Sequence, residues 1–400
     1  MEVLSDRILQ MAASETLAMT QAARDLKAQG KDVISLSIGE PDFNTPETIK
    51  EAAKKAIDDN FSHYPPVPGY ADLKEAVCKK FKRDNNLDFT PDQIIVSTGA
   101  KQSIYQVVQC LVNPGDEVVI PTPYWVSYRE IVKVAGGECI YVKTAIENDF
   151  KVTAEQLEKA ITPKTKLIMF SSPSNPTGML YSKEELRKIA DMLQKHPHVY
   201  VMADEIYEHI NFVGKHESLA QFPEIKERVI TINGVAKGYA MTGWRIGFIA
   251  APLFIAKACN KLQGQITSAT CSIAQKATVR AMELDPATDK DIIWMREQFK
   301  ERRDLVYKLL CEIPGLKVRL PQGAFYFFPE VSSYFGKSYG EYSIKNSTDL
   351  CMYLLHEANV ATVMGSAFGD DNCIRLSYAT SKETLIEAIR RIKEALAKLK

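Results

Sequence analysis

The sequence lacks the features that mark a metal cluster, a disulfide scaffold or a membrane span. Its eight cysteines stand singly, with no C-x-x-C pair and no histidine at the spacing of metal ligands. Its apolar runs have the length of single strands, far below the roughly 20 residues that cross a bilayer. Residues 1–10 carry Glu2, Asp6 and Arg7 and contain no apolar stretch typical of a secretion signal. We therefore expect a cytoplasmic protein with reduced thiols and no membrane partner.

An excess of charge is also missing. The 50 Lys and Arg residues balance 50 Asp and Glu residues, so the formal net charge is zero and no positive field exists to hold nucleic acid. What is present is ordinary globular composition, with 46% hydrophobic and 25% charged residues. At about 100–200 residues per domain, the 400 residues allow two to four domains.

Short runs suited to strands alternate with helical patterns between about residues 90 and 250, as in a mostly parallel sheet with crossover helices. The expected strands are 94–98, 117–120, 138–142, 166–170, 199–203, 229–233 and 246–250. The expected helices between them are 102–111, 126–135, 154–161 and 183–194. The chain between the last two strands is too short for a crossover helix, so we expect this pair to be antiparallel. The pattern predicts a doubly wound α/β domain.

The rest of the chain predicts a second, smaller α/β domain. Its expected helices are 291–310, 348–357 and 382–399, and its expected strands are 317–320, 325–328 and 374–378. We divide the chain into an N-terminal arm and helix that pack with the small domain (1–45), a large domain (46–289) and a small C-terminal domain (290–400).

A glycine and several unusual polar residues follow the carboxyl ends of different expected strands, where open α/β sheets bind ligands. The antiparallel last strand adds the residue at its own start to this edge. The set is Gly99, Lys101, Asn175, Asp204, Tyr207, Lys237 and Arg245. An acid, a phenol, an amide, a lysine and an arginine that meet at one edge predict a binding or catalytic site.

Each of these motifs alone also fits a plain structural role. The turn 97–101 suits either an anion at a helix N-terminus or a simple strand-to-helix turn. Asp204 either caps a helix or pairs with a buried cation. Lys237 is either a solvated surface lysine or, among small and apolar neighbours, a desolvated amine suited to carbonyl chemistry. We favour the site because the motifs coincide at one edge of the sheet.

Four motifs carry a family resemblance. They read S-P-S-N-P-T-G at 172–178, A-D-E-I-Y-E at 203–208, G-V-A-K-G-Y-A-M-T-G-W-R-I-G at 234–247 and I-R-L-S-Y-A at 374–379. In this order and separation, the chain resembles the fold-type I, pyridoxal-phosphate-dependent aminotransferases of class I/II, and most closely the bacterial subgroup Ib aspartate aminotransferases. The resemblance covers nearly the whole chain. It implies pyridoxal 5′-phosphate as cofactor and a homodimer with shared active sites.

The resemblance also implies roles for residues around the cofactor ring. Lys237 would bind the cofactor covalently and, once released by substrate, carry a proton between the substrate Cα and the cofactor. Asp204 would pair with the ring nitrogen and keep it protonated. Asn175 and Tyr207 would hydrogen-bond the ring oxygen, and Trp125 would stack on the ring face.

For the phosphate, the resemblance implies a turn at a helix start, one arginine and one residue from the partner subunit. These are Gly99, Ala100 and Lys101, with Arg245 and Tyr64. Many relatives carry serines where this chain has Gly234 and Ala236. Phosphate binding here would therefore depend more on backbone N–H groups and on Arg245. The alternative for Trp125 is the role of a core aromatic residue, and the alternative for Tyr64 is the role of a surface phenol.

For the substrate, the resemblance implies two carboxylate sites. Arg375 would bind the α-carboxylate in a bidentate pair, helped by the backbone of Gly39. Lys101 would bind the distal carboxylate of aspartate or glutamate. Trp125 and Asn175 are assigned to the substrate as well as to the cofactor.

The resulting expectation is reversible amino transfer from L-aspartate to 2-oxoglutarate, giving oxaloacetate and L-glutamate. An aromatic, kynurenine or prephenate aminotransferase, or a β-lyase, on the same scaffold stays open. Subgroup members that act on prephenate carry lysine or arginine at the position of Ala12, so we expect weak or no prephenate activity.

A DNA-binding regulator built on an aminotransferase-like domain is the alternative from another class. Such regulators carry an added N-terminal DNA-binding module, whereas the aminotransferase-like sequence here begins by about Leu4. A non-catalytic interaction protein on the same scaffold would have lost Lys237 or Asp204, and both are present. We therefore expect an enzyme.

Overall fold

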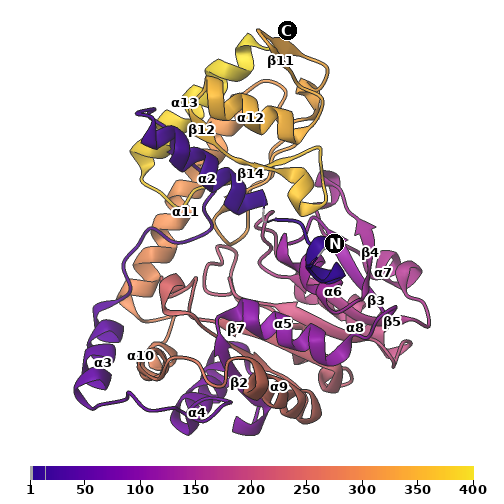
Figure 1. The fold of residues 1–400 in the computed structure, drawn as a ribbon, viewed down its shortest axis with the longest axis vertical. Coiled ribbons are helices and arrows are strands. Elements are labelled where there is room, and N and C mark those ends of the chain that lie inside the picture. Colours follow the sequence, from indigo (N-terminus) through magenta and orange to yellow (C-terminus); the bar gives the residue numbers. More distant parts are fainter. Residues whose placement is uncertain (1–2, 14) are drawn as a thin grey trace.

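The computed structural model describes residues 3–13 and 15–400. The expected arm, 1–45, thus includes residues 1, 2 and 14, which lie outside the described residues. The described part of this arm holds α1 (Asp6–Leu9), α2 (Glu15–Ala28) and β1 (Ile34–Ser35). Figure 1 places α2 against the C-terminal part of the chain, beside α13 and β12.

Within the described residues, the central sheet has seven strands in the order β2-β8-β7-β6-β5-β3-β4. Their bounds are β2 Ile94–Thr98, β3 Glu117–Thr122, β4 Glu138–Lys143, β5 Thr165–Ser171, β6 Tyr200–Asp204, β7 Val229–Gly234 and β8 Ile246–Ala250. Only β8 runs antiparallel, to both β2 and β7. The predicted antiparallel strand is confirmed, because the segment before it holds only the short turn Thr242–Trp244 and no crossover helix.

Helices cover both faces of this sheet because successive side chains of each strand point to opposite faces. Val96 of β2 packs with one face and Ile95 with the other. One face carries α5 (Ala100–Leu111), α6 (Ser127–Val134) and α9 (Leu253–Ile266). The other carries α3 (Glu47–Asp58), α4 (Ala71–Lys80), α7 (Ala154–Ala160), α8 (Lys183–Gln194) and α10 (Ser272–Glu283). The predicted α/β fold with a mostly parallel sheet is confirmed.

The C-terminal part forms a smaller α/β unit around its own core. Its helices are α11 (Lys290–Cys311), α12 (Ser347–Glu357) and α13 (Lys382–Lys398). Its strands are β9 (Tyr326–Phe327), β10 (Ser338–Tyr339), β11 (Tyr342–Ser343), β12 (Val360–Ala361), β13 (Val363–Met364) and β14 (Ile374–Ser377). The order β13-β14-β9 forms an antiparallel sheet, and β12 pairs in parallel with β1 of the arm.

One predicted strand is wrong. Residues 317–320 form no strand, only an isolated bridge between Lys317 and Glu330. Only Val318 of this segment packs against the C-terminal core, Leu320 is exposed, and Pro321, which lacks the N–H group that a strand pairing needs, follows directly.

Helix α11 connects the two units (Figure 1). Ile292 and Met295 pack in the core of the large sheet, whereas Phe299 and Val306 pack in the C-terminal core. The domain division at residues 46 and 290 remains our proposal. Among the described residues, no helix combines the length and the apolar character needed to cross a bilayer.

Candidate active site

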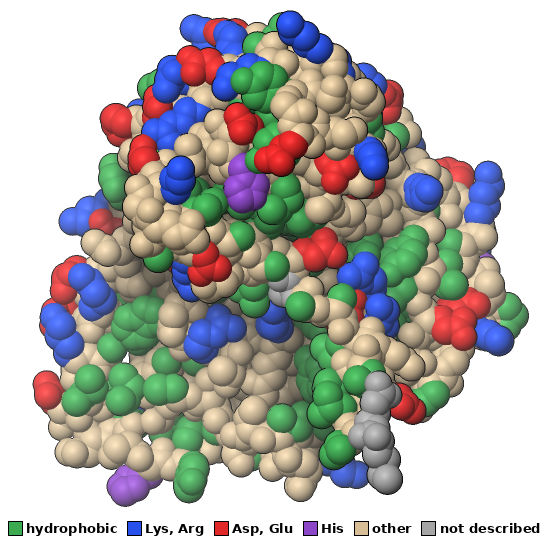
Figure 2. Space-filling model, turned by 45° about the horizontal axis from the view of Figure 1, so that its top comes forward, with side chains coloured by type: hydrophobic (Ala, Val, Ile, Leu, Met, Phe, Trp, Pro, Cys, Tyr) green, Lys and Arg blue, Asp and Glu red, His purple; other side chains and the backbone are tan. Residues whose placement is uncertain are grey.

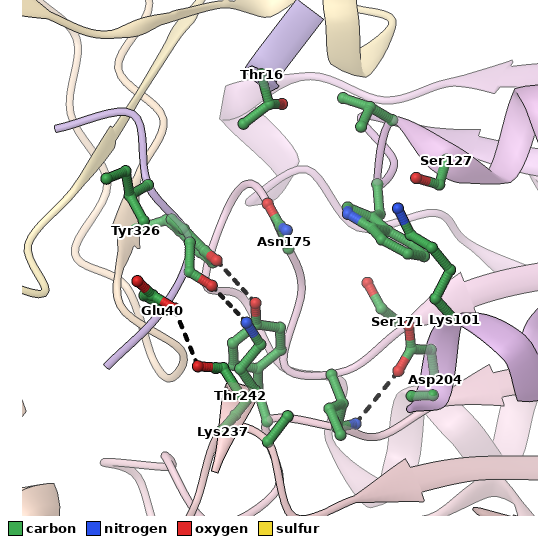
Figure 3. A pocket seen from close by; sticks show the side chains of 18 of the residues that line it. Thr16, Glu40, Lys101, Ser127, Ser171, Asn175, Asp204, Lys237, Thr242 and Tyr326 are labelled. Carbon is green, nitrogen blue, oxygen red and sulfur yellow. Dashed lines mark hydrogen bonds between the residues drawn. The ribbon is translucent and has the colours of Figure 1, made fainter. Parts of the chain in front are cut away.

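A cleft of about 420 Å³ opens where the strands of the large sheet end and the C-terminal unit begins. Helix α2 forms part of its wall through Thr16, Leu17 and Thr20. The predicted site residues that line it are Gly39, Ala100, Lys101, Trp125, Asn175, Asp204, Tyr207, Lys237, Arg245 and Arg375. Figure 3 shows this cleft, and Figure 2 shows basic side chains along the hollow beneath the upper part of the molecule.

Lys237 projects into the cleft from the turn after β7 (Figure 3). Its amine donates a hydrogen bond to the carbonyl of Gly39 and lies 5.7 Å from the ring centroids of Tyr207 and Phe325. Desolvation, together with the positive charge of Arg375, lowers the pKa of this amine to about 8. About a tenth of this amine is thus uncharged and nucleophilic at pH 7, far more than for a solvated lysine.

Asp204 ends β6 with its carboxylate buried. The hydroxyl of Tyr128 donates to Oδ2 over 2.8 Å, and the backbone N–H of Ile206 donates to Oδ1 over 3.3 Å. Burial raises the pKa of Asp204 to about 6, despite these hydrogen bonds. A buried carboxylate of this kind suits a cationic N–H partner in the cleft, which would restore its low pKa.

Gly99 and Arg245 form a cradle at the N-terminus of α5. Gly99 has φ +78°, and a Cβ placed on it would collide with the guanidinium of Arg245. Arg245 itself has φ +57°, a strained value for a non-glycine residue, and its Nη1 donates to the carbonyl of Thr242 over 2.9 Å. Backbone N–H groups at a helix start and a guanidinium beside them are the donors that a phosphate prefers.

Arg375 stands on β14, 2% exposed, between the rings of Tyr326 and Phe368. Its Nη1 donates to Oδ1 of Asn175 over 3.0 Å, and its Nη2 donates to the carbonyl of Ser37 over 2.7 Å. Its Nε has no hydrogen-bond partner among the described residues. The predicted arginine and amide therefore meet across the two units.

Lys101 lies on α5 with its amine 5.0 Å from the ring centroid of Trp125. Burial, with the nearby Arg245, lowers the pKa of Lys101. No acidic side chain of the described residues forms an ion pair with it. It is a cation at the cleft, on the large-domain side, that is free to pair with a ligand.

Gly99 lies at the cradle beside the cleft and not in its lining, and Tyr64 is the predicted residue that stands apart from the cleft. Its side chain is 98% exposed in the single chain. Its predicted role depends on a partner subunit and stays a prediction.

Sequence reasoning missed two tyrosines that support the site. Tyr128 follows Trp125 by three residues and reaches Asp204 from α6. Tyr326 shares a hydrogen bond of 2.8 Å with the hydroxyl of Tyr207, and a Cβ at Gly39 would lie only 2.6 Å from its oxygen. The i, i+3 spacing after Trp125 was a usable signal for Tyr128, whereas Tyr326 is distant in the sequence and left none.

These groups together fit pyridoxal phosphate. Its phosphate matches the Gly99–Arg245 cradle, its ring nitrogen matches the buried carboxylate of Asp204, and its aldehyde matches the amine of Lys237. The match rests on three features: the close approach of Gly99 to Arg245, the buried acid Asp204 and the desolvated amine of Lys237. No purely structural role requires all three together.

Comparisons with known proteins agree with this geometry. Residues 31–392 match the family Aminotransferase class I and II. The chain is 46% identical over 402 residues to the aspartate/prephenate aminotransferase of Cereibacter sphaeroides, with 100% of each chain covered. It is 47% identical to a bifunctional aspartate aminotransferase and glutamate/aspartate-prephenate aminotransferase of Petunia hybrida, covering 99% of this chain and 83% of that protein.

Solved structures give the same result. The aspartate aminotransferase of Rhizobium meliloti superimposes with a TM-score of 0.96 at 42% identity, covering 100% of both chains. That of Thermus thermophilus with maleate superimposes with a TM-score of 0.93 at 40% identity, covering 99% of this chain and 100% of that one. From its sequence, its fold and its cleft, the chain belongs to the class I and II aminotransferases, enzymes that depend on pyridoxal phosphate.

Proposed function

We propose that the chain is an aspartate aminotransferase that transfers the amine of L-aspartate to 2-oxoglutarate. The observation that carries the proposal is a pair of cations that the cofactor does not need. Arg375 faces the cleft from the small-domain strand β14, and Lys101 faces it from the large-domain helix α5. Two cations on two sides of one cleft suit a substrate with two carboxylates.

Bound pyridoxal phosphate supplies an aldehyde that condenses with amines and a ring that withdraws electrons from the substrate Cα. In our proposal, Asp204 holds the ring nitrogen in its protonated form, and Tyr128 orients that carboxylate. Asn175 and Tyr207 hydrogen-bond the ring oxygen. Trp125 covers one ring face, and its position beneath the Lys101 amine keeps that cation near the substrate.

The chain's own residues then direct the substrate and the proton. Arg375 binds the α-carboxylate with its guanidinium, which Asn175 and the carbonyl of Ser37 already orient. Lys237 in its uncharged form removes the proton at the substrate Cα, as a pKa of about 8 permits near neutral pH. Gly39, whose carbonyl accepts from the Lys237 amine in this structure, contacts the substrate through its backbone.

Two further parts of the proposal concern the assembly and the location of the protein. The site is shared in a homodimer, with Tyr64 reaching the phosphate of the partner subunit; its full exposure in one chain supports this. A second cavity, lined by Thr98, Trp244 and Arg245, borders the phosphate cradle, and we propose it as the place where the tyrosine of the other subunit enters. We also propose a cytoplasmic location, in keeping with the unpaired cysteines. A monomeric species in sedimentation velocity of the loaded enzyme would contradict the shared site.

Prephenate is the second candidate substrate, because several similar proteins carry an aspartate/prephenate aminotransferase name. Our proposal is that this chain discriminates against prephenate, since Ala12 supplies no charge beside Lys101 in the neighbouring cavity. Arg24 on α2 is the additional cation along the cleft wall whose contribution must be tested.

The test of the proposed function is a titration of the loaded enzyme with single amino acids while its cofactor absorbance is recorded. Aspartate and glutamate should convert the cofactor to its amine form at far lower concentrations than alanine, phenylalanine or kynurenine. Addition of 2-oxoglutarate should restore the original spectrum. Preference for an aromatic or neutral amino acid, or release of pyruvate or ammonia, would reject the aspartate assignment in favour of an aromatic aminotransferase or a β-lyase.

A further inference from the structure

A buried network of five polar side chains lies behind the cleft, outside the residues that line it. Its members are Lys80, Asn85, Glu208, His209 and Asn233. Lys80 forms an ion pair with the carboxylate of Glu208 and donates to Asn85 over 2.9 Å. Glu208 also accepts from Asn85 over 3.0 Å and from Asn233 over 2.8 Å. Its Oε1 lies 3.3 Å from His209 Nε2.

The network touches the two segments that carry Asp204 with Tyr207 and Lys237. Glu208 belongs to the turn after β6 that also holds Asp204 and Tyr207. Asn233 belongs to the end of β7, from which the chain leads to Lys237. His209 packs against the next turn, since a Cβ at Gly238 would lie 2.9 Å from its own Cβ.

The hydroxyl of Tyr239, two residues after the catalytic lysine, completes this contact. It lies 3.3 Å from His209 Nε2, and the two rings meet edge to face. The turn with Asp204 and the turn with Lys237 are thus joined on the side away from the substrate.

The charges of the network are matched, so it does not have the character of a ligand site. Asp84, whose carboxylate lies near His209, is held by Arg83 over 2.6 Å and 3.0 Å. Burial opposes ionisation of Glu208, but the positive charge of Lys80 outweighs it and lowers the pKa of this carboxyl group. Burial lowers the pKa of His209 to about 4, which leaves this imidazole neutral at pH 7.

A buried ion pair contributes little net stability, because the cost of desolvating both charges offsets their attraction. Its directional hydrogen bonds nevertheless fix the elements that bear them. Here those elements are the end of α4 with the turn after it, the turn 204–209 and the end of β7.

We propose that Lys80 and Glu208, with Asn233 and His209, are positioning residues that hold the Asp204–Tyr207 turn in register with Lys237. They act through those residues and touch neither cofactor nor substrate. The inference rests on the proposed roles of Asp204 and Lys237 at the cofactor. A failure of those roles would be visible in the wild-type enzyme, whereas a failure of this inference is visible only in the variants below.

The decisive variant is Lys80→Met combined with Glu208→Gln, which removes both charges and retains an amide oxygen for the asparagines. Loss of register should lower kcat by about 10–100-fold, as small misplacements of reacting groups do. KM for aspartate should change little, because Arg375 and Lys101 lie outside the network. The pH midpoint of the cofactor absorbance should be displaced from the wild-type value, since it reports the contact of Asp204 and Lys237 with the cofactor.

A readout without cofactor separates register from chemistry. Hydrogen exchange of the backbone amides of 206–210 in the apo chain should be faster in the double variant than in the wild type. The matched control is Lys74→Met, which removes another lysine of α4. The partner of Lys74 is the exposed Asp92, outside the network. This control should leave kcat, the pH midpoint and the exchange unchanged.

A purely structural role predicts a different result. The double variant should then have the wild-type unfolding midpoint and the wild-type kcat. The pH midpoint of its cofactor absorbance should also equal the wild-type value, and that outcome would overturn the proposal. If the double variant does not fold, Asn233→Ala keeps the ion pair and removes one donor to Glu208. It should displace the pH midpoint in the same direction by a smaller amount, and an unchanged midpoint with unchanged kcat would equally reject the inference.

Discussion

In our proposal, the chemistry of the cleft depends on Lys237, whose desolvated amine acts as both nucleophile and base. We expect Lys237→Ala to abolish transamination and the absorbance band of the covalently bound cofactor. Circular dichroism should be unchanged, since the substitution removes an amine that forms no ion pair with any carboxylate of the described residues. Transamination near the wild-type rate in this variant would reject the assigned mechanism.

Single substitutions should separate the two proposed carboxylate sites. Arg375→Leu should lower kcat/KM for every amino acid. Lys101→Ser should lower kcat/KM for aspartate and glutamate far more than for alanine or phenylalanine. Loss of a charge-assisted contact costs about 1.5–3 kcal/mol, or roughly ten- to a hundredfold in kcat/KM. Arg375→Lys is the matched control, because it keeps the charge and loses the bidentate geometry, and it should remain impaired. Equal losses for acidic and neutral substrates in Lys101→Ser would remove Lys101 from the distal site.

At the level of single residues, sequence reasoning found groups that stand directly after a strand and missed groups brought in by packing. Asp204 and Lys237 were predictable because each ends or follows an apolar strand. Tyr326 was not, because its contact with Tyr207 joins residues far apart in the chain. The same applies to Lys80 and Glu208, whose pairing depends on the packing of α4 against the central sheet.

At the level of elements, strands with apolar runs were predicted well, whereas the two-residue strands β12 and β13 were not predicted. Residues 94–98 and 246–250 coincide with β2 and β8 as observed. The two-residue strands β12 and β13 have no periodicity to detect, because each is defined only by its partner. Helix α5 begins at Ala100, two residues before the expected start, because Gly99 with its positive φ forms the cap that the hydrophobic pattern does not show.

The N-terminal segment gives a prediction about specificity. The backbone N–H of Ala12 donates to Glu130 Oε2 over 3.1 Å, which places this segment against α6 beside Lys101. Prephenate brings a second carboxylate that Ala12 cannot pair, so its kcat/KM should be low in the wild type, and Ala12→Lys should raise it selectively. Aspartate should be served equally well by both enzymes.

The control for this prediction is Arg24→Ala, measured with the same two substrate pairs. Arg24 lines the cleft from α2 and is the remaining cation on that wall. Efficient prephenate turnover by the wild type would contradict the prediction. Loss of that turnover in Arg24→Ala would then identify this arginine as the cation that replaces the missing side chain at Ala12.

At the level of the whole molecule, the alternation of strands and helices was enough to predict the α/β class and the antiparallel strand. The meeting of the two units across the cleft was not predictable from local pattern. Arg375 donates hydrogen bonds to Asn175 and to the carbonyl of Ser37, and these three residues come from three different parts of the chain. Such contacts arise from the packing of complete cores, and only the family resemblance indicated them beforehand.

The free energy of unfolding of the apo protein should depend on pH, because burial of the ionised Asp204 carboxylate is unfavourable. Its folded pKa of about 6 lies above the usual value near 4, so the folded chain holds this proton more tightly than the unfolded chain. Stability is therefore lost as the pH rises from about 4 to about 6, by up to about 3 kcal/mol for a shift of about two units. Asp204→Asn avoids this penalty and keeps an oxygen for Tyr128.

We therefore expect the apo Asp204→Asn variant to be inactive yet more stable than the apo wild type at pH 8, with the two converging near pH 4. Urea unfolding at both pH values measures this difference. Pyridoxal phosphate should reduce the difference, because a protonated ring nitrogen beside the carboxylate relieves its desolvation in the wild type. An apo variant that is less stable than the wild type at pH 8 would contradict this prediction. It would show that the hydrogen bonds of the Asp204 carboxylate stabilise the apo protein by more than the burial of its charge destabilises it.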